Sequence, residues 1–213
     1  TCIPIAVAIS FPLNHFTIIL DTVRALIRAG KYDGCLRIYC HQNLIPAITS
    51  IAEMTVQKKF TSLIGERILL CPVKDGDRHI LLSRPVTFFD IHSTKAEQYG
   101  FSIEMKTGKK LVCLGDEPYN PVCERYVKGC DWMLSEAFCL YSQKEKFKPY
   151  EKHHSTVRDA CQLAQQMKVP NLVLWHTEDK NYDRRKELYA AEGAPLYSGN
   201  LYIPYDLEVM DLT

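Results

Sequence analysis

The sequence carries almost no net charge, because 26 lysine and arginine residues stand against 25 aspartate and glutamate residues in a chain of 213. This balance provides no overall electrostatic attraction to nucleic acid or to an anionic membrane surface, although local patches can still bind either. The sequence also lacks internal repeats, low-complexity tracts and any clear domain boundary. Its length and its 46% hydrophobic content predict a globular protein with one domain over residues 1–213.

None of the nine cysteines forms a Cys-x-x-Cys pair. This spacing excludes a zinc knuckle, and the odd number leaves at least one cysteine without a partner in the chain. Several cysteines lie in strand-like runs, for example Cys113 within residues 111–114. We therefore expect buried thiols in a reducing cytoplasm and no disulfide framework.

No segment has the length of uninterrupted apolar sequence, about 18 residues, that a membrane helix requires. The most apolar stretch, residues 1–20, is interrupted by Pro4, Pro12, Asn14 and His15, and it lacks the basic start of a signal peptide. We expect this stretch to contribute a core strand and the start of a helix, and we expect no association with a membrane.

The spacing of apolar residues indicates a chain in which helices and strands alternate. Helices are expected over residues 16–29, over 44–60, and from a cap at Ser155 or Thr156 to Met167. Strands are expected over residues 36–40, 67–73, 79–82, 85–91, 101–105, 110–114, 172–175 and 200–204, with a further element over 132–138.

Residues that can carry chemistry stand where several of these elements end. Asp116 and His176 follow strands, Glu136 lies at an element's end, and His154 lies on the loop between them. In an open α/β sheet, sites form where loops leave the carboxyl ends of the strands. His176 is therefore a candidate metal ligand or base; the alternative is a histidine that only caps its loop.

Short motifs recur in a fixed order in the second half of the chain. They are Gly115-Asp116, then Ser135-Glu136-Ala137-Phe138 with His154-Ser155-Thr156, then Leu174-Trp175-His176. This order resembles the carboxyl-terminal half of the metallo-β-lactamase fold, and the middle pair resembles the His-Glu-Ala-Thr and His-Ser-Thr motifs of its RNase Z-like branch. The longer runs FFDIHSTKAEQYGF, KKLVCLGDEPYN, FKPYEKHHSTV and HTEDKNYDRRKELY resemble uncharacterised bacterial hydrolases of this branch.

The resemblance implies an α/β fold, a four-layer αββα sandwich, and hydrolysis assisted by two divalent ions, usually zinc. Such ions lower the pKa of a bridging water and hold the attacked phosphoryl oxygens. By resemblance, Asp116 would bridge the ions and His176 would ligate the second. His92 would ligate the first ion; the alternative is an ordinary loop histidine.

The resemblance also assigns Glu136 and His154 to acid catalysis. His154 would protonate the departing oxygen, and Glu136 would hold the imidazole. The alternative is a purely structural hydrogen bond beneath the site. Ser135 stands where the branch has the histidine of its glutamate motif.

The chain departs from the family at its main metal motif, His-x-His-x-Asp-His, which the sequence does not contain. If His15 aligns with the last histidine of that motif, Ser10, Pro12 and Asn14 replace the other ligands, and proline cannot bind a metal. The glycine-containing strands that begin the family's first sheet are missing too, so we expect an N-terminally incomplete sandwich.

A complete binuclear site takes about seven protein ligands. This chain offers Asp116, His176, His92 and His15, so we expect zinc, or another divalent metal, to be bound below full stoichiometry. Two functions remain open. The first is metal-dependent hydrolysis of a phosphodiester, either RNA or a small nucleotide. The second is a non-catalytic protein that keeps the fold for assembly. In either case we expect a cytoplasmic homodimer.

Overall fold

The structure is a computed structural model that describes residues 6–8, 34–94 and 97–212. His15 and the helix expected over residues 16–29 lie outside the described residues. No helix in the described part of the chain is both long and apolar enough to cross a membrane.

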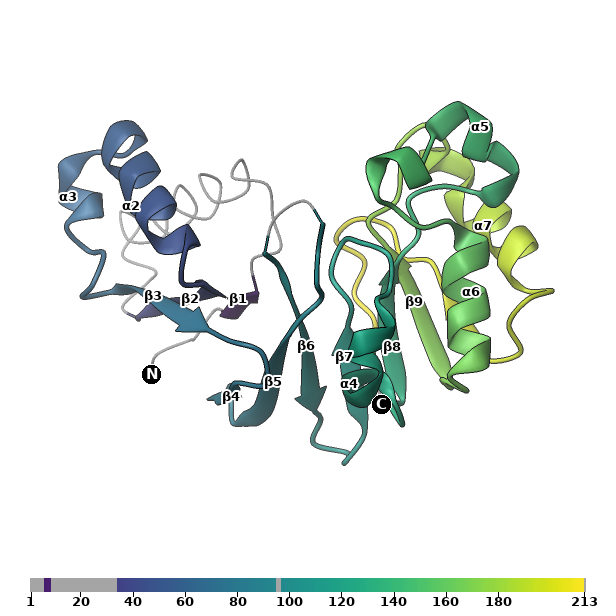
Figure 1. The fold of residues 1–213 in the computed structure, drawn as a ribbon, viewed down its shortest axis with the longest axis horizontal. Coiled ribbons are helices and arrows are strands. Elements are labelled where there is room, and N and C mark those ends of the chain that lie inside the picture. Colours follow the sequence, from purple (N-terminus) through teal and green to yellow (C-terminus); the bar gives the residue numbers. More distant parts are fainter. Residues whose placement is uncertain (1–5, 9–33, 95–96, 213) are drawn as a thin grey trace.

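The described strands form two sheets (Figure 1). The smaller sheet is parallel, in the order β1-β2-β3, with β1 at Ala6–Ala8, β2 at Leu36–His41 and β3 at Ile68–Val73. The larger sheet has the order β10-β9-β8-β7-β6-β5-β4. Its strands are β4 (Arg78–Leu81), β5 (Arg84–Asp90), β6 (Tyr99–Glu104), β7 (Lys110–Cys113), β8 (Trp132–Glu136), β9 (Asn171–Trp175) and β10 (Asn200–Tyr202).

The strand pairing of the larger sheet changes from antiparallel to parallel at β7. Strands β4 to β7 pair antiparallel, whereas β7 to β10 pair parallel. Leu82 and Ser83 both have positive φ angles and join β4 to β5, which is the two-residue turn that matches the twist of a hairpin. The β6–β7 hairpin turns through Gly108, at φ 80°, where the sequence predicted a tight turn.

The α-helices are α2 (Leu44–Thr55), α3 (Lys58–Thr61), α4 (Glu124–Val127), α5 (Lys144–Phe147), α6 (Val157–Gln166) and α7 (Arg185–Gly193). Four short 3-10 helices lie at Pro121–Cys123, Tyr141–Gln143, Tyr150–Lys152 and Tyr182–Arg184 in the described chain. Figure 1 shows α2 and α3 beside the smaller sheet and α4 to α7 beside the larger one.

The buried side chains lie between four layers. Ile48 and Ala52 of α2 pack against β2 of the smaller sheet. On the other face of that sheet, Tyr39 stacks on Phe88 of β5, with the ring centroids 5.3 Å apart. The far face of the larger sheet packs against α4, α6 and α7. The order helix, sheet, sheet, helix confirms the αββα sandwich predicted from the sequence.

Helix α6 begins at a capping box immediately after the His154-Ser155 dipeptide. The Thr156 hydroxyl caps the Asp159 N–H, and the Asp159 carboxylate accepts the Thr156 N–H at 2.8 Å. These bonds satisfy backbone donors that the first turn leaves unpaired. Of the two caps considered from the sequence, Thr156 is therefore the one used, and it fixes the position of the residues just before it.

The helix expected over residues 44–60 is interrupted. Val56 is extended, at φ −115° and ψ 143°, so α2 ends at Thr55 and α3 starts at Lys58. Two consecutive β-branched residues, Thr55 and Val56, disfavour helix at this point. Apolar residues continue at helical spacing across the break, which is why the sequence pattern predicted one helix.

The cysteines support a prediction about thiol reactivity. All eight described cysteines are free. Burial raises the pKa of Cys113 to about 11 and that of Cys161 to about 12. Because the thiolate is the reactive form, these two should not react with Ellman's reagent in native protein at pH 8, and their reactivity should rise only as the pH approaches these values.

Mass-spectrometric mapping after brief labelling would check this prediction, with labelling in guanidinium as the control in which every thiol reacts. The partly exposed Cys35 is the internal reference within the described chain. Labelling of Cys113 or Cys161 in native protein as fast as Cys35 would contradict the buried positions.

Candidate metal and catalytic site

Four of the residues predicted from the sequence leave the larger sheet at one edge. Strands β5 and β7 are both antiparallel to β6, and β7, β8 and β9 are parallel, so β5, β7, β8 and β9 all run in the same direction. Their carboxyl ends therefore meet at one edge (Figure 1). His92 follows β5, Asp116 follows β7, Glu136 ends β8, and His176 follows β9.

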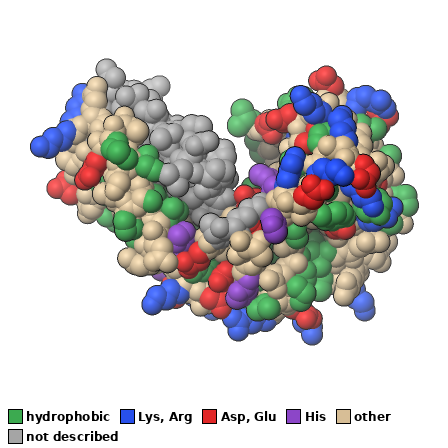
Figure 2. Space-filling view, turned by 45° about the horizontal axis from the view of Figure 1, so that its top comes forward, with side chains coloured by type: hydrophobic (Ala, Val, Ile, Leu, Met, Phe, Trp, Pro, Cys, Tyr) green, Lys and Arg blue, Asp and Glu red, His purple; other side chains and the backbone are tan. Residues whose placement is uncertain are grey.

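Three of these strand exits turn through the left-handed backbone region. The φ angles are 55° at His92, 83° at Gly115 and 51° at His176. Positive φ is uncommon for residues other than glycine, and such residues gather at functional sites. Figure 2 shows several histidine side chains exposed on one face of the molecule. The backbone thus turns sharply at the places where the candidate side chains are presented.

Glu136 and His154 form a short hydrogen bond in the interior. The distance from Nδ1 of His154 to Oε2 of Glu136 is 2.6 Å, and Glu136 is fully buried. Oε1 of Glu136 accepts the backbone N–H of Ser155 at 2.7 Å. Burial raises the pKa of Glu136, while the hydrogen bond from His154 acts in the opposite direction. Both carboxylate oxygens are therefore already occupied within the protein.

The imidazole of His154 is held on more than one side. Its ring stacks on Phe138, with centroids 4.8 Å apart, and lies 5.2 Å from the ring of His176. An ionised carboxylate can only accept hydrogen bonds, so Nδ1 is the donor to Glu136. This makes Nε2 the nitrogen that can exchange a proton with a bound molecule. Only 14% of the side chain is exposed, so its orientation is well defined.

The donor chemistry of the site fits a divalent ion. Within the described residues, one group of possible metal ligands is found, and it consists of Glu136, His154 and His176. Their potential ligand atoms all lie within 4.8 Å of one another. Glu136 is committed to hydrogen bonds, which leaves imidazole nitrogen as the available donor. Imidazole nitrogen and carboxylate oxygen are both zinc ligands. Asp116, partly buried at the exit of β7, is a carboxylate at the same sheet edge but is not a member of this group.

His92 lies at the same edge but is more exposed. Its side chain is 45% exposed, and its Nδ1 lies 3.8 Å from Oδ2 of Asp90. Its backbone N–H donates to Oδ1 of Asp90 at 2.7 Å, which fixes the turn after β5. A ligand role for His92 stays a prediction, as does that of His15, which lies outside the described residues. His153, next to His154, is exposed, and its Nδ1 lies 3.1 Å from the Thr94 hydroxyl.

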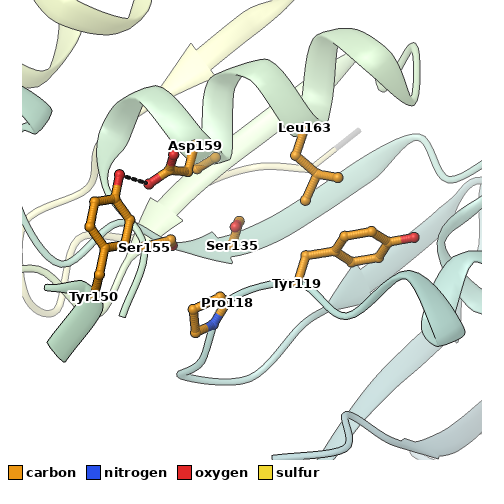
Figure 3. A pocket seen from close by; sticks show the side chains of 8 residues that line it. Pro118, Tyr119, Ser135, Tyr150, Ser155, Asp159 and Leu163 are labelled. Carbon is orange, nitrogen blue, oxygen red and sulfur yellow. Dashed lines mark hydrogen bonds between the residues drawn. The ribbon is translucent and has the colours of Figure 1, made fainter. Parts of the chain in front are cut away.

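A cavity of about 220 Å³ is lined by residues that adjoin Glu136 and His154 in the sequence. Ser135 precedes Glu136 in the sequence, and Ser155 donates its backbone N–H to Glu136. Both serines line the cavity together with Tyr119, Tyr150, Asp159 and Leu163 (Figure 3). At its rim, the Tyr150 hydroxyl donates to Asp159 at 2.9 Å. Ser135, which stands where the RNase Z-like branch has the histidine of its glutamate motif, is thus one of the residues that line this cavity.

The sequence analysis did not single out Arg185. This residue is buried, at 3% exposure, and lines a hollow that His176 also lines. The sequence signal that could have indicated its burial is the spacing of four residues between Arg185 and Tyr189, which places both on the buried face of α7. Because charged residues are almost never buried without a partner, an arginine at this position would be expected at the surface. The sequence therefore gave no reason to predict a site there.

Comparison with curated proteins finds partial matches. No protein-family model matches the chain. The ribonuclease Z of Shouchella clausii is 33% identical over 112 residues, covering 53% of this chain and 35% of that protein. The ribonuclease Z of Thermococcus sibiricus is 33% identical over 112 residues, covering 51% and 33%. The matches therefore span about a third of the length of these relatives.

Solved structures match over most of the chain. The metallo-β-lactamase fold protein YhfI from Bacillus subtilis has a TM-score of 0.70 at 15% identity, covering 95% of this chain and 74% of that one. The short form of human tRNase Z has a TM-score of 0.66 at 18% identity, covering 99% and 79%. At these identities the likeness establishes the fold.

Proposed function

We propose that this chain, which is an RNase Z-like member of the metallo-β-lactamase superfamily, hydrolyses phosphodiester bonds with a bound divalent metal ion. The observation that carries the proposal is the buried Glu136–His154 pair beside His176, at the sheet edge to which Asp116 also belongs. A buried carboxylate that orients an imidazole is a recurrent arrangement for moving a proton.

We propose zinc as the ion, held by Asp116 and His176, with His92 and His15 as further ligands. When bound, such an ion supplies an activated water and stabilises negative charge on phosphoryl oxygens. Asp116 leaves β7 directly after Gly115, whose φ of 83° lets the chain turn there. Asp116, His176 and His92 thus follow strands of one sheet, which favours a defined geometry.

The protein's own acid chemistry is assigned to the Glu136–His154 pair. His154 would give the proton on Nε2 to the departing oxygen, while its Nδ1 proton stays on the hydrogen bond to Glu136. The carboxylate stabilises the charged imidazole before the transfer and holds the ring in place afterwards. Because Glu136 is shielded from water, this electrostatic support is stronger than it would be at the surface.

The substrate class is the least specified part of the proposal. The curated relatives are named ribonuclease Z, which supports RNA; a small nucleotide is the second substrate that we propose. A homodimer and a cytoplasmic location also belong to the proposal. The second is supported by the free, buried thiols, which persist in reducing compartments.

Metal content distinguishes hydrolysis from a non-catalytic role in assembly, which the missing His-x-His-x-Asp-His motif supports. We would purify the protein without chelator, measure metal per chain by elemental analysis, and assay an RNA oligonucleotide and bis(p-nitrophenyl) phosphate. We expect bound metal, hydrolysis, and loss of hydrolysis after chelation with recovery on adding zinc. No metal in excess zinc, together with no hydrolysis of either substrate, would leave the assembly role as the function.

A further inference from the structure

Arg185 is a buried guanidinium whose hydrogen-bonding capacity is largely unused. It begins α7 and is 3% exposed, and its Nε and Nη2 atoms are buried without a hydrogen-bond partner. The acid recorded near it is Asp179, whose Oδ1 lies 3.8 Å from Nη2 and whose side chain is 89% exposed. The guanidinium also lies over the Tyr182 ring, with Cζ 4.9 Å from the ring centroid. Because burying a charge is costly, an anion bound to the unused Nε and Nη2 donors would add compensation that these two contacts do not supply.

The cations on either side of Arg185 in the sequence are arranged differently. Nη2 of Arg184 lies 2.9 Å from Glu187, and Nζ of Lys186 lies 2.6 Å from Glu208. Arg184 is 64% exposed and Lys186 is 41% exposed. These two residues make close surface ion pairs, whereas Arg185 between them is buried and has its recorded acid, Asp179, at 3.8 Å.

The hollow that Arg185 lines belongs to the same edge of the sheet as the candidate site. It has a volume of about 290 Å³, and Trp175-His176-Thr177 form one wall, while residues 204–206 form another. His176 is the candidate ligand that follows β9. An oxyanion bound to Arg185 would therefore lie beside the group undergoing hydrolysis, on the side of β9 and α7.

We propose that Arg185 binds the phosphate next to the scissile one in a sugar-phosphate chain, an inference that rests on the proposed function. A guanidinium presents a planar fork of donors that matches two phosphate oxygens. Asp179 and Asp206, which are exposed and also line the hollow, would repel inorganic phosphate. They can accept hydrogen bonds from sugar hydroxyls, so the hollow suits a sugar phosphate better than inorganic phosphate.

The kinetic test compares two substrates and two variants. For Arg185→Met we expect KM for a ribotrinucleotide to rise about 10- to 100-fold, as for loss of a charged hydrogen bond. For bis(p-nitrophenyl) phosphate, which has no neighbouring phosphate, kcat/KM should change less than about twofold. Arg184→Met is the matched control and should leave both substrates unchanged. An equal loss on both substrates, or no loss on either, would overturn the proposal.

A binding measurement on the unaltered protein needs no turnover. In ¹⁵N-arginine-labelled protein, ribose 5-phosphate should shift the Nε–H signal of Arg185, assigned by its absence in Arg185→Lys, and should leave that of Arg184 in place. Inorganic phosphate should cause a smaller shift. This measurement decides the matter even if Arg185→Met does not fold, and an unmoved Arg185 signal at saturating sugar phosphate would overturn the proposal.

The two proposals fail in different ways. Hydrolysis that depends on His154 but not on Arg185, with no shift of the Arg185 signal, would refute the phosphate subsite alone. A sugar-phosphate-dependent shift in a protein that hydrolyses neither substrate would refute the hydrolase alone and leave a sugar-phosphate binding site.

Discussion

Replacing His154 with asparagine is expected to lower the rate of RNA hydrolysis about 10²- to 10⁴-fold, the usual contribution of a positioned acid. Asparagine can still donate a hydrogen bond to Glu136, which accepts His154 at 2.6 Å in the unaltered protein, but it cannot deliver a proton. The bound metal should remain, because Asp116 and His176 are unchanged. Steady-state kinetics with elemental analysis of the same samples would measure both.

The dependence on the leaving group separates an acid role from a structural one. Because p-nitrophenolate departs without a proton, His154→Asn should impair bis(p-nitrophenyl) phosphate hydrolysis far less than RNA hydrolysis. His153→Asn is the matched control, since His153 is exposed and its φ of 55° is one that asparagine adopts readily. An equal loss on the two substrates would show that the Glu136–His154 bond only supports the fold.

Glu136→Gln, like His154→Asn, should impair RNA hydrolysis more than bis(p-nitrophenyl) phosphate hydrolysis. Glutamine keeps the shape of the side chain but removes the charge that stabilises the imidazolium. It should also lower stability, because a buried group that accepts from both His154 and Ser155 loses part of its bonding. Comparing the two variants tests whether the pair acts as one unit, in which case the double variant should be hardly slower than either single variant.

Much of the site could be predicted because the relevant residues stand at strand ends. Parallel strands place their carboxyl ends together, so Asp116, Glu136 and His176 could be assigned to one edge from the order of elements alone. The placement of His92 depends on the two reversals of strand direction between β5 and β7, which make these two strands run the same way. Each of these inferences needed only local pattern and strand direction.

What the sequence did not predict depends on long-range packing. Helix α7 buries Arg185, Tyr189 and Gly193, a face that mixes charged, polar and small residues and so shows no apolar period. The hollow beside Arg185 forms between β9, α7 and residues 204–206, which are three separate segments of the chain. Such a surface exists only after these segments pack, and no local motif reports it.

Replacing Asp116 with asparagine is expected to weaken metal binding by at least about 100-fold, more than the 10- to 100-fold cost of losing an outer partner of a ligand. Asparagine removes the negative charge that balances the cation, while its shape preserves the turn after Gly115. The loss should be visible without any activity assay, because an ion that binds the folded state stabilises it by an amount that grows with its saturation. Zinc should raise the Tm of the unaltered protein and leave that of Asp116→Asn nearly unchanged.

Glu117→Gln is the control for Asp116→Asn, because the adjacent Glu117 is buried and its Oε1 accepts the Ser93 hydroxyl at 2.7 Å, a bond that glutamine can retain. This variant should keep both metal and the Tm response to zinc. Equal zinc stabilisation of Asp116→Asn and the unaltered protein would mean that the ion binds elsewhere. Because Glu136, His154 and His176 would still be close together, the acid pair would then have to act on a substrate held without Asp116, and the bridging role inferred for that carboxylate would be wrong.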